Sequence, residues 1–126
     1  STYPDSLAPD EVSRADSGAK ESGYVDADRE LFENELSAVM GKAMAIVRDE
    51  ASLTEGLAAL EELKKKFKAP NQTGRLRLAE AMIMSAISRK ESRGAHYRSD
   101  YPAASEEYAL PSCVFYENDS IIVKMD

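Results

Sequence analysis

The sequence predicts an all-α fold: an antiparallel three-helix bundle of the spectrin-repeat type, with an extended acidic N-terminal arm and a C-terminal β-hairpin. Three observations predict it. Apolar residues recur every three or four positions in three segments between 26 and 92, which is the spacing of amphipathic helices. Short loops separate these segments, as they do between antiparallel neighbours. After Pro102, two apolar runs flank four polar residues, a pattern typical of a hairpin.

The chain has the length and composition of one domain. Its 126 residues suit a single hydrophobic core, and 43% of them are hydrophobic. We assign residues 1–25 to the arm, 26–102 to the three-helix bundle and 103–126 to a tail that contains the hairpin. The arm is rich in Pro, Gly, Ser and acidic residues and has too few aliphatic residues to bury a face, so it is predicted to be a linker.

The first helix is predicted to run from Asp26 over about 22 residues. Asp26 or Asp28 can cap its N-terminus, because a carboxylate accepts hydrogen bonds from the free amides of the first turn. The expected apolar positions are Phe32, Leu36, Val39, Met40, Ala43, Ile46 and Val47.

The second helix is predicted to begin at Ser52, because Ser52 and Glu55 have the spacing of a capping box. It is expected to end near Lys68, before Pro70. Its apolar positions are Leu53, Leu57, Leu60, Leu63 and Phe67. Positive charge in the last turn suits the helix dipole. The residues that supply it are Lys64, Lys65, Lys66 and Lys68.

The third helix is predicted to begin at a cap on Asn71 or Thr73 and to end near Ser92, with Gly94 as a left-handed terminator. Its apolar positions are Leu76, Leu78, Ala79, Met82, Ile83, Ala86 and Ile87. We interpret the methionines of this helix as core residues rather than as a cofactor site; they are Met82 and Met84.

The predicted hairpin pairs residues 113–116 with residues 121–125 across the polar segment 117–120. An isolated hairpin is marginally stable in water. We therefore expect it to pack on the bundle or on another surface.

No motif for catalysis or cofactor binding is recognised in the chain. It has no glycine-rich phosphate loop, no metal-ligand spacing and no nucleophile elbow, so no catalytic, cofactor-binding or metal-binding residue is assigned. Cys113 is the single cysteine, which fits a reducing compartment, and no run of eighteen apolar residues is present. We expect a cytoplasmic protein without direct membrane insertion.

Charge is segregated along the chain. The net charge is −7, but residues 64–98 hold ten basic and two acidic groups. Two interpretations stay open: solvated faces of opposite sign, or a basic surface for an acidic partner. The acidic total and the lack of a basic and aromatic recognition motif argue against nucleic acid as a partner.

Polar groups are densest where the third helix ends, between 89 and 102. His96 among arginines and tyrosines could act as a general base or bind an anion, or it could cap the helix end or donate a hydrogen bond at an interface. For Arg93 and Arg98 the simpler interpretation is a salt bridge with Glu91 or Asp100.

This segment, RKESRGAHYRSDYP from Arg89 to Pro102, resembles the signature at the end of the last bundle helix in the succinate dehydrogenase and fumarate reductase flavoprotein family. L-aspartate oxidase and adenylylsulfate reductase are relatives of that family. The resemblance extends over residues 28–102, which look like the carboxy-terminal three-helix domain of these proteins.

The resemblance implies that the chemistry lies in domains outside this chain. The partners would be the FAD-binding and capping domains, with an electron-transfer subunit as a further possible partner. No cofactor is expected in this chain, whereas FAD is expected in the full-length protein, and the chain alone is expected to be colourless and inactive. Six signature residues are candidates for contact across the domain junction: Glu91, Ser92, Arg93, Gly94, His96 and Arg98. Our hypothesis is that the arginines and the histidine bond across the junction and hold the flavin domain closed.

After Pro102 the chain departs from the family, because residues 103–105 stand where an acidic pair is usual. This departure puts a covalent flavin link in doubt. Residues 95–98 lead us to favour the fumarate and succinate type over L-aspartate oxidase. The alternatives are the carboxy-terminal domain of an L-aspartate oxidase, or a free-standing interaction module that binds an acidic partner through residues 64–98.

Overall fold

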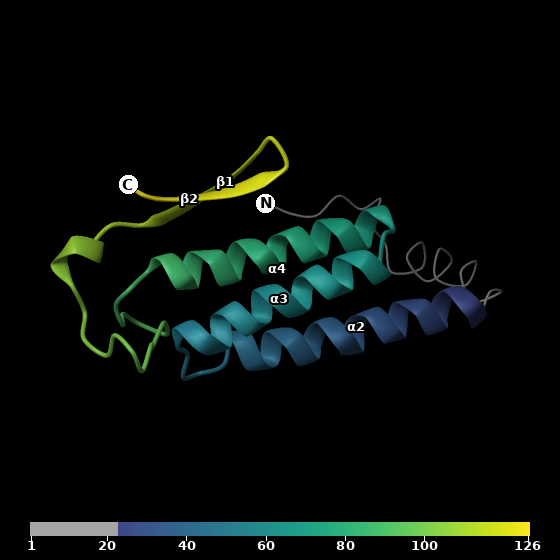
Figure 1. Ribbon diagram of the computed structural model, residues 1–126, viewed down its shortest axis with the longest axis horizontal. Helices are drawn as coiled ribbons and strands as arrows, with labels where there is room; N and C mark the ends of the chain where they lie inside the picture. The colour runs from purple at the N-terminus through teal and green to yellow at the C-terminus, as the bar shows by residue number, and fades with distance from the viewer. Residues whose placement is uncertain (1–22) are drawn as a thin grey trace, which may run out of the picture. The chain divides into compact units, whose positions relative to one another are not determined.

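The computed structural model describes residues 23–126 of the chain, with side chains from residue 27 onward. The described residues form three α-helices, one 3-10 helix and one two-stranded antiparallel hairpin (Figure 1). The elements are α2 (Gly23–Ala43), α3 (Glu50–Lys66), α4 (Pro70–Ser88), η2 (Glu106–Tyr108), β1 (Ser112–Glu117) and β2 (Ser120–Met125). The predicted fold class is confirmed. Of the predicted arm, residues 1–22 lie outside the described residues.

Helix α2 begins earlier than predicted. It starts at Gly23, so Asp26 and Asp28 lie within the helix, and the prediction that one of them caps it is wrong. The helix also ends earlier than predicted, at Ala43, so Ile46 and Val47 lie beyond it and are exposed, and the expectation that they belong to its apolar face is wrong. The apolar period that we used to locate this helix identifies neither of its ends.

Helix α3 also begins before the predicted cap. Asp49 is its N-terminal cap: the Asp49 Oδ1 atom accepts a 2.8 Å hydrogen bond from the Ser52 backbone amide, and the Asp49 amide donates to Ser52 Oγ at 3.1 Å. The prediction that Ser52 pairs with Glu55 is therefore wrong by three residues. An aspartate is the better cap, because its negative charge faces the positive end of the helix dipole.

Helix α4 begins with Pro70, whose missing amide costs nothing at a first helical position. The caps predicted at Asn71 and Thr73 are wrong, since both residues lie inside the helix. Ala69 precedes the helix, and its side chain has no oxygen that could cap it. Instead, the Gln72 Oε1 atom accepts a 3.2 Å hydrogen bond from the Ala69 backbone amide.

Helix α4 ends at Ser88 rather than near Ser92. Gly94 does have a left-handed backbone, with φ of 61°, but it lies six residues beyond the helix end and does not terminate it. Its turn belongs to the loop that follows the helix.

The core lies where α3 and α4 face each other and where the end of α2 meets α3. Its buried side chains are Leu53, Leu60 and Leu63 from α3, Phe67 directly after that helix, and Leu76, Ala79, Ile83 and Ala86 from α4. Leu36 and Ala43 are the buried residues near the end of α2. Met82 is 44% exposed, so its assignment to the core was wrong.

The hairpin closes with a two-residue turn at Asn118 and Asp119, which have φ of 51° and 60°. Positive φ at both positions is typical of a type I′ turn, whose twist matches that of the strands. The hairpin packs along α4 (Figure 1), where the Arg77 guanidinium lies 4.5 Å from the centre of the Tyr116 ring. The expectation that the hairpin packs on the bundle is confirmed.

The lysines at the end of α3 are paired with carboxylates. Lys64 contacts Glu61 at 2.9 Å and Glu80 at 2.5 Å. The remaining pairs are Lys65 with Glu62 at 3.3 Å and Lys66 with Glu35 at 2.8 Å. Much of the positive charge in this segment is therefore balanced by acidic neighbours.

Gly56 in α3 packs directly against Ala43 of α2. A Cβ atom at position 56 would lie 2.5 Å from the Ala43 Cβ atom, whereas a Cβ atom at Gly74 in α4 would meet nothing within 4 Å. We expect Gly74→Ala to stabilise the chain by about 1 kcal/mol through helix propensity alone. Gly56→Ala gains the same propensity but must separate two helices, and overpacking of this kind costs about 1–3 kcal/mol.

Urea unfolding of the two variants gives their free energies of unfolding. Both variants gain the same helix propensity, so the difference between these free energies measures the cost of the contact between position 56 and Ala43. Equal stabilities of Gly56→Ala and Gly74→Ala would show that α2 and α3 do not approach as described.

Candidate interdomain site at the end of α4

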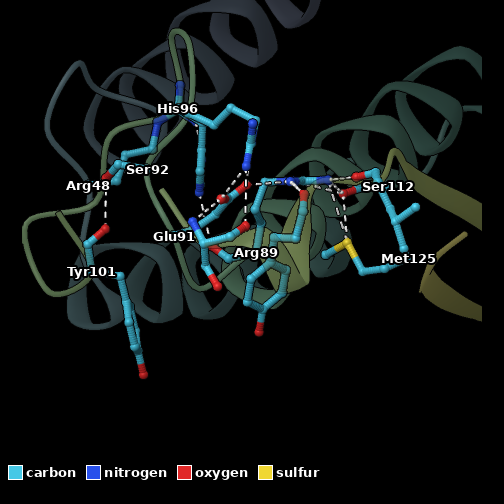
Figure 2. Close-up of polar contacts among 12 residues, drawn as sticks. Arg48, Arg89, Glu91, Ser92, His96, Tyr101, Ser112 and Met125 are labelled. Carbon is cyan, nitrogen blue, oxygen red and sulfur yellow. Dashed lines mark hydrogen bonds and ion pairs between the residues drawn. The ribbon is translucent and has the colours of Figure 1, made fainter. Parts of the chain in front are cut away.

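The six candidate residues lie in one loop that folds back on itself after α4. The amide and carbonyl groups of Arg93 and His96 exchange hydrogen bonds of 2.8 and 3.0 Å, which closes a tight turn around Gly94. Ser92 closes a wider turn, because its Oγ atom accepts from the Arg98 amide at 2.9 Å and donates to the Tyr101 carbonyl at 2.8 Å. Figure 2 shows the hydrogen bond between Ser92 and Tyr101 as a dashed line.

Arg98 has no exposed surface, and its guanidinium joins three parts of the chain. The Nη1 atom donates to the α4 carbonyls of Ala86 and Ile87 at 3.2 and 2.8 Å. The Nε and Nη2 atoms form a fork on the Asp100 carboxylate at 3.0 and 2.7 Å, and Nη2 also reaches Glu50 at 3.4 Å. The hydrogen bonds from Arg98 hold the pKa of Asp100 below its ordinary value.

The loop between α2 and α3 is hydrogen-bonded to the same segment. The Arg48 amide donates to the Tyr97 carbonyl at 3.0 Å, and the Ser99 amide donates to the Arg48 carbonyl at 2.8 Å. The Glu50 amide, at the start of α3, donates to Asp100 Oδ2 at 3.1 Å. Residues about 50 positions apart in sequence are thus fixed side by side.

Glu91 is the second buried charge of the site. Its carboxylate accepts from Arg93 at 3.0 and 3.2 Å, from Arg89 at 2.6 Å and from the Ser105 amide at 2.8 Å. The hydrogen bond from Arg93 is the largest cause that lowers the pKa of Glu91 to about 2, and burial opposes it. Glu91 therefore remains an anion at every physiological pH.

Arg89 carries the network from Glu91 to the hairpin. Its guanidinium donates to the carbonyls of Tyr108, at 2.7 Å, and Leu110, and to Ser112 Oγ at 3.0 Å. Figure 2 shows the side chain extended from Glu91 toward Ser112 and Met125. The end of α4 and the start of β1 are therefore held by one side chain.

His96 bridges two arginines through different ring atoms. Its Nδ1 atom lies 3.2 Å from Arg48 Nη1, and its Nε2 atom lies 3.0 Å from the Arg89 carbonyl oxygen. Because arginine only donates and a carbonyl only accepts, this network assigns the neutral tautomer with the proton on Nε2. The contact with the carbonyl of Arg89, the C-terminal cap of α4, fits the interpretation of His96 as a cap at the helix end, and its role as a donor at an interface stays a prediction.

The simpler interpretations of the two arginines are also confirmed, since Arg93 pairs with Glu91 and Arg98 with Asp100. Two residues that complete the site were missed. Arg89 belongs to the signature segment but was not among its six candidate residues. An arginine just beyond a helix end can donate to backbone carbonyls that lack a partner there, and this signal could have identified it. Arg48 lies 48 residues from His96, and no local pattern indicates that pairing.

The described residues do not fit a flavin site of their own. A dinucleotide such as FAD is usually held by a strand, a glycine-rich turn and a helix beside a parallel sheet. In residues 23–126 the strands β1 and β2 form only an antiparallel hairpin. Within the same residues there is no acidic, cysteine or histidine cluster that could hold a metal, and no helix long and apolar enough to cross a membrane.

Known proteins resemble the chain over most of its length. The family model for the fumarate reductase flavoprotein C-terminus matches residues 70–126. The L-aspartate oxidase of Pyrococcus horikoshii is 43% identical over 86% of this chain. A solved structure of E. coli quinol fumarate reductase FrdA covers 99% of this chain with a TM-score of 0.67 and 19% identity. The chain is a carboxy-terminal domain of this flavoprotein family.

The domain is a small part of the proteins it resembles. It spans 20% of the P. horikoshii L-aspartate oxidase and 25% of the FrdA chain. The fumarate reductase flavoprotein subunit of Haemophilus influenzae is 28% identical over 92% of this chain, and the chain spans 22% of that subunit. The L-aspartate oxidase is thus the more similar of these relatives, although residues 95–98 favoured the other type.

The low pKa of Glu91 predicts a pH dependence of stability. A carboxyl whose pKa falls from 4.5 to about 2 on folding stabilises the fold above pH 4.5, and this contribution is lost as the pH falls toward 2. We expect Glu91→Gln to be less stable than the wild type at pH 7, with a difference that shrinks between pH 4.5 and 2. Urea unfolding at several pH values measures this stability difference. Asp100 is present in both proteins, so its titration cancels in the comparison. A difference that is independent of pH would contradict the pairing.

Proposed function

We propose that this domain is not catalytic by itself and that it packs on and supports the FAD-binding and capping domains of an FAD-dependent oxidoreductase. The observation that carries the proposal is the loop 89–105, in which two buried charges, Glu91 and Arg98, hydrogen-bond to several parts of the loop and to the end of α4. Buried ion pairs add little net stability compared with apolar packing, and their better-attested use is to specify one geometry. A loop held in this way is suited to present a fixed surface to another domain.

The exposed side chains of this loop are of the kinds found at the centres of interfaces. Arg93 is 45% exposed, and Tyr97 and Tyr101 are exposed as well. Arginine and tyrosine are enriched where protein surfaces bury their strongest contacts. The Arg98 guanidinium lies over the Tyr101 ring at 4.9 Å, which fixes the direction of that ring.

The six candidate residues divide into two roles under this proposal. Arg93 contacts the neighbouring domain directly, and Gly94 permits the turn that presents it. Glu91 and Arg98 have no exposed surface in this chain, so they act by shaping the loop. Ser92 and His96 do the same through their hydrogen bonds within it.

For the full-length protein we propose L-aspartate oxidation rather than fumarate or succinate chemistry. The support is the 43% identity to an L-aspartate oxidase, against 28% to a fumarate reductase flavoprotein subunit over a similar share of the chain. A free-standing module that binds acidic partners through residues 64–98 is less well supported, since Lys64, Lys65 and Lys66 already pair with glutamates.

Removal of Arg93 from the full-length flavoprotein tests the supporting role. We expect Arg93→Ala to lower the ratio of FAD to protein after gel filtration, because the flavin domain loses a charged contact that helps to close it. The matched control is Lys65→Ala, which removes an exposed, glutamate-paired cation on α3 and should leave the ratio unchanged. Turnover with L-aspartate and with succinate, measured on the same preparations, distinguishes the two substrates.

Unchanged FAD content and turnover in Arg93→Ala would overturn the supporting role. Turnover with succinate alone would overturn the assignment to L-aspartate and leave the supporting role intact.

A further inference from the structure

Helix α4 is apolar on two sides, and the bundle covers only one of them. The covered side is formed by Leu76, Ala79, Ile83 and Ala86. On the second side, Leu78 is 64% exposed and Met82, one turn later, is 44% exposed. A soluble helix usually keeps its second face polar, so two large exposed apolar side chains in one row indicate a surface for a partner.

This second side forms the floor of a groove of about 400 Å³. Val114 of β1 and Met44, which follows α2, also line this groove. Arg48 and His96 line the groove together with these residues. We call it the α4–β1 groove, and most of its lining is apolar.

Arg48 brings an unbalanced positive charge to this groove. Its Nε atom donates to the Ala45 carbonyl at 3.0 Å, and its Nη1 atom donates to the neutral His96 ring at 3.2 Å. Within residues 27–126 it forms no ion pair with a carboxylate. By contrast, each arginine of the loop 89–105 pairs with a carboxylate: Arg89 and Arg93 share Glu91, and Arg98 pairs with Asp100.

We propose that the α4–β1 groove binds a segment of the flavoprotein that lies outside this chain, with an apolar side chain over Met82 and a carboxylate on Arg48. The inference rests on the proposed function, because its partner is the remainder of that flavoprotein. About four-fifths of the length of the relatives lies outside the matched region, which is ample chain to supply the segment. An apolar floor with an unpaired guanidinium is complementary to such a segment, since arginine binds carboxylates in a fork geometry.

The two arms of the test are Met82→Glu in the groove and Phe115→Glu on the opposite face of β1. Both side chains are apolar and 44% exposed in this chain, and Phe115 follows Val114 along the strand, so it points away from the groove. In the 126-residue chain we expect both variants to unfold at the wild-type midpoint. In the full-length flavoprotein, we expect Met82→Glu to abolish the hydrogen-exchange protection that the partner segment adds to residues 78–89 and 112–114. Phe115→Glu should retain that protection.

A second pair of variants tests the charge. Arg48→Gln should weaken the same protection in the full-length flavoprotein, and Arg48→Lys should retain more of it than Arg48→Gln, because the lysine keeps the positive charge but lacks the fork of donors. Protection in the wild type should also decrease at high salt, which screens a partly exposed ion pair.

Two results would overturn the groove. One is equal exchange of residues 78–89 in the wild-type flavoprotein and in the 126-residue chain. The other is full protection in Met82→Glu. If Arg93→Ala still releases FAD in either case, the supporting function stands and only the groove is lost. If none of these variants has an effect, both proposals fail.

Discussion

The buried guanidinium of Arg98 is the interaction on which the rest of the described structure depends. It donates to the last carbonyls of α4, which carry the negative end of that helix dipole, and its partner Asp100 accepts from the first amide of α3, at the positive end. One ion pair thus satisfies two helix ends that meet at the same place. Removing either charge would leave buried polar groups without partners, which costs more than the pair itself contributes.

The second ion pair cluster extends this arrangement to the hairpin. Glu91 holds Arg89 and Arg93 on one side of the loop, and Arg89 continues to the carbonyls and hydroxyl that begin β1. A two-stranded hairpin has no core of its own, so its position against α4 depends on such contacts and on the packing of Tyr116 beneath Arg77. The loop, the hairpin and the helix end consequently form one continuous surface. Its exposed arginine and tyrosines, and the apolar groove beside it, are consistent with a domain whose partner lies elsewhere in the same protein.

The sequence predicted those features that depend on neighbours along the chain. Apolar periodicity located the three helices, the polar segment 117–120 located the turn, and the ion pairs of Arg93 and Arg98 join residues only two positions apart. Features that depend on distant residues could not be predicted. Arg48 meets His96 only because two loops are paired, and periodicity does not tell which apolar side of α4 the bundle covers, so Met82 was misplaced. Helix ends were the least predictable, since Asp49 and Gln72 cap by local geometries that other polar residues nearby could equally have adopted.

The most direct test of the role of Arg98 is amide hydrogen exchange in the 126-residue chain, wild type against Arg98→Lys. A lysine keeps the charge but cannot reach the α4 carbonyls, Asp100 and Glu50 together, because it lacks the planar fork of donors. The account predicts faster exchange at the amides of Arg48, Glu50 and Ser99, while the amide of Leu60 in the middle of α3 keeps its protection. Unchanged exchange at those three amides, or an equal loss of protection at Leu60, would contradict the claim that this one guanidinium holds the helix ends and the loop together.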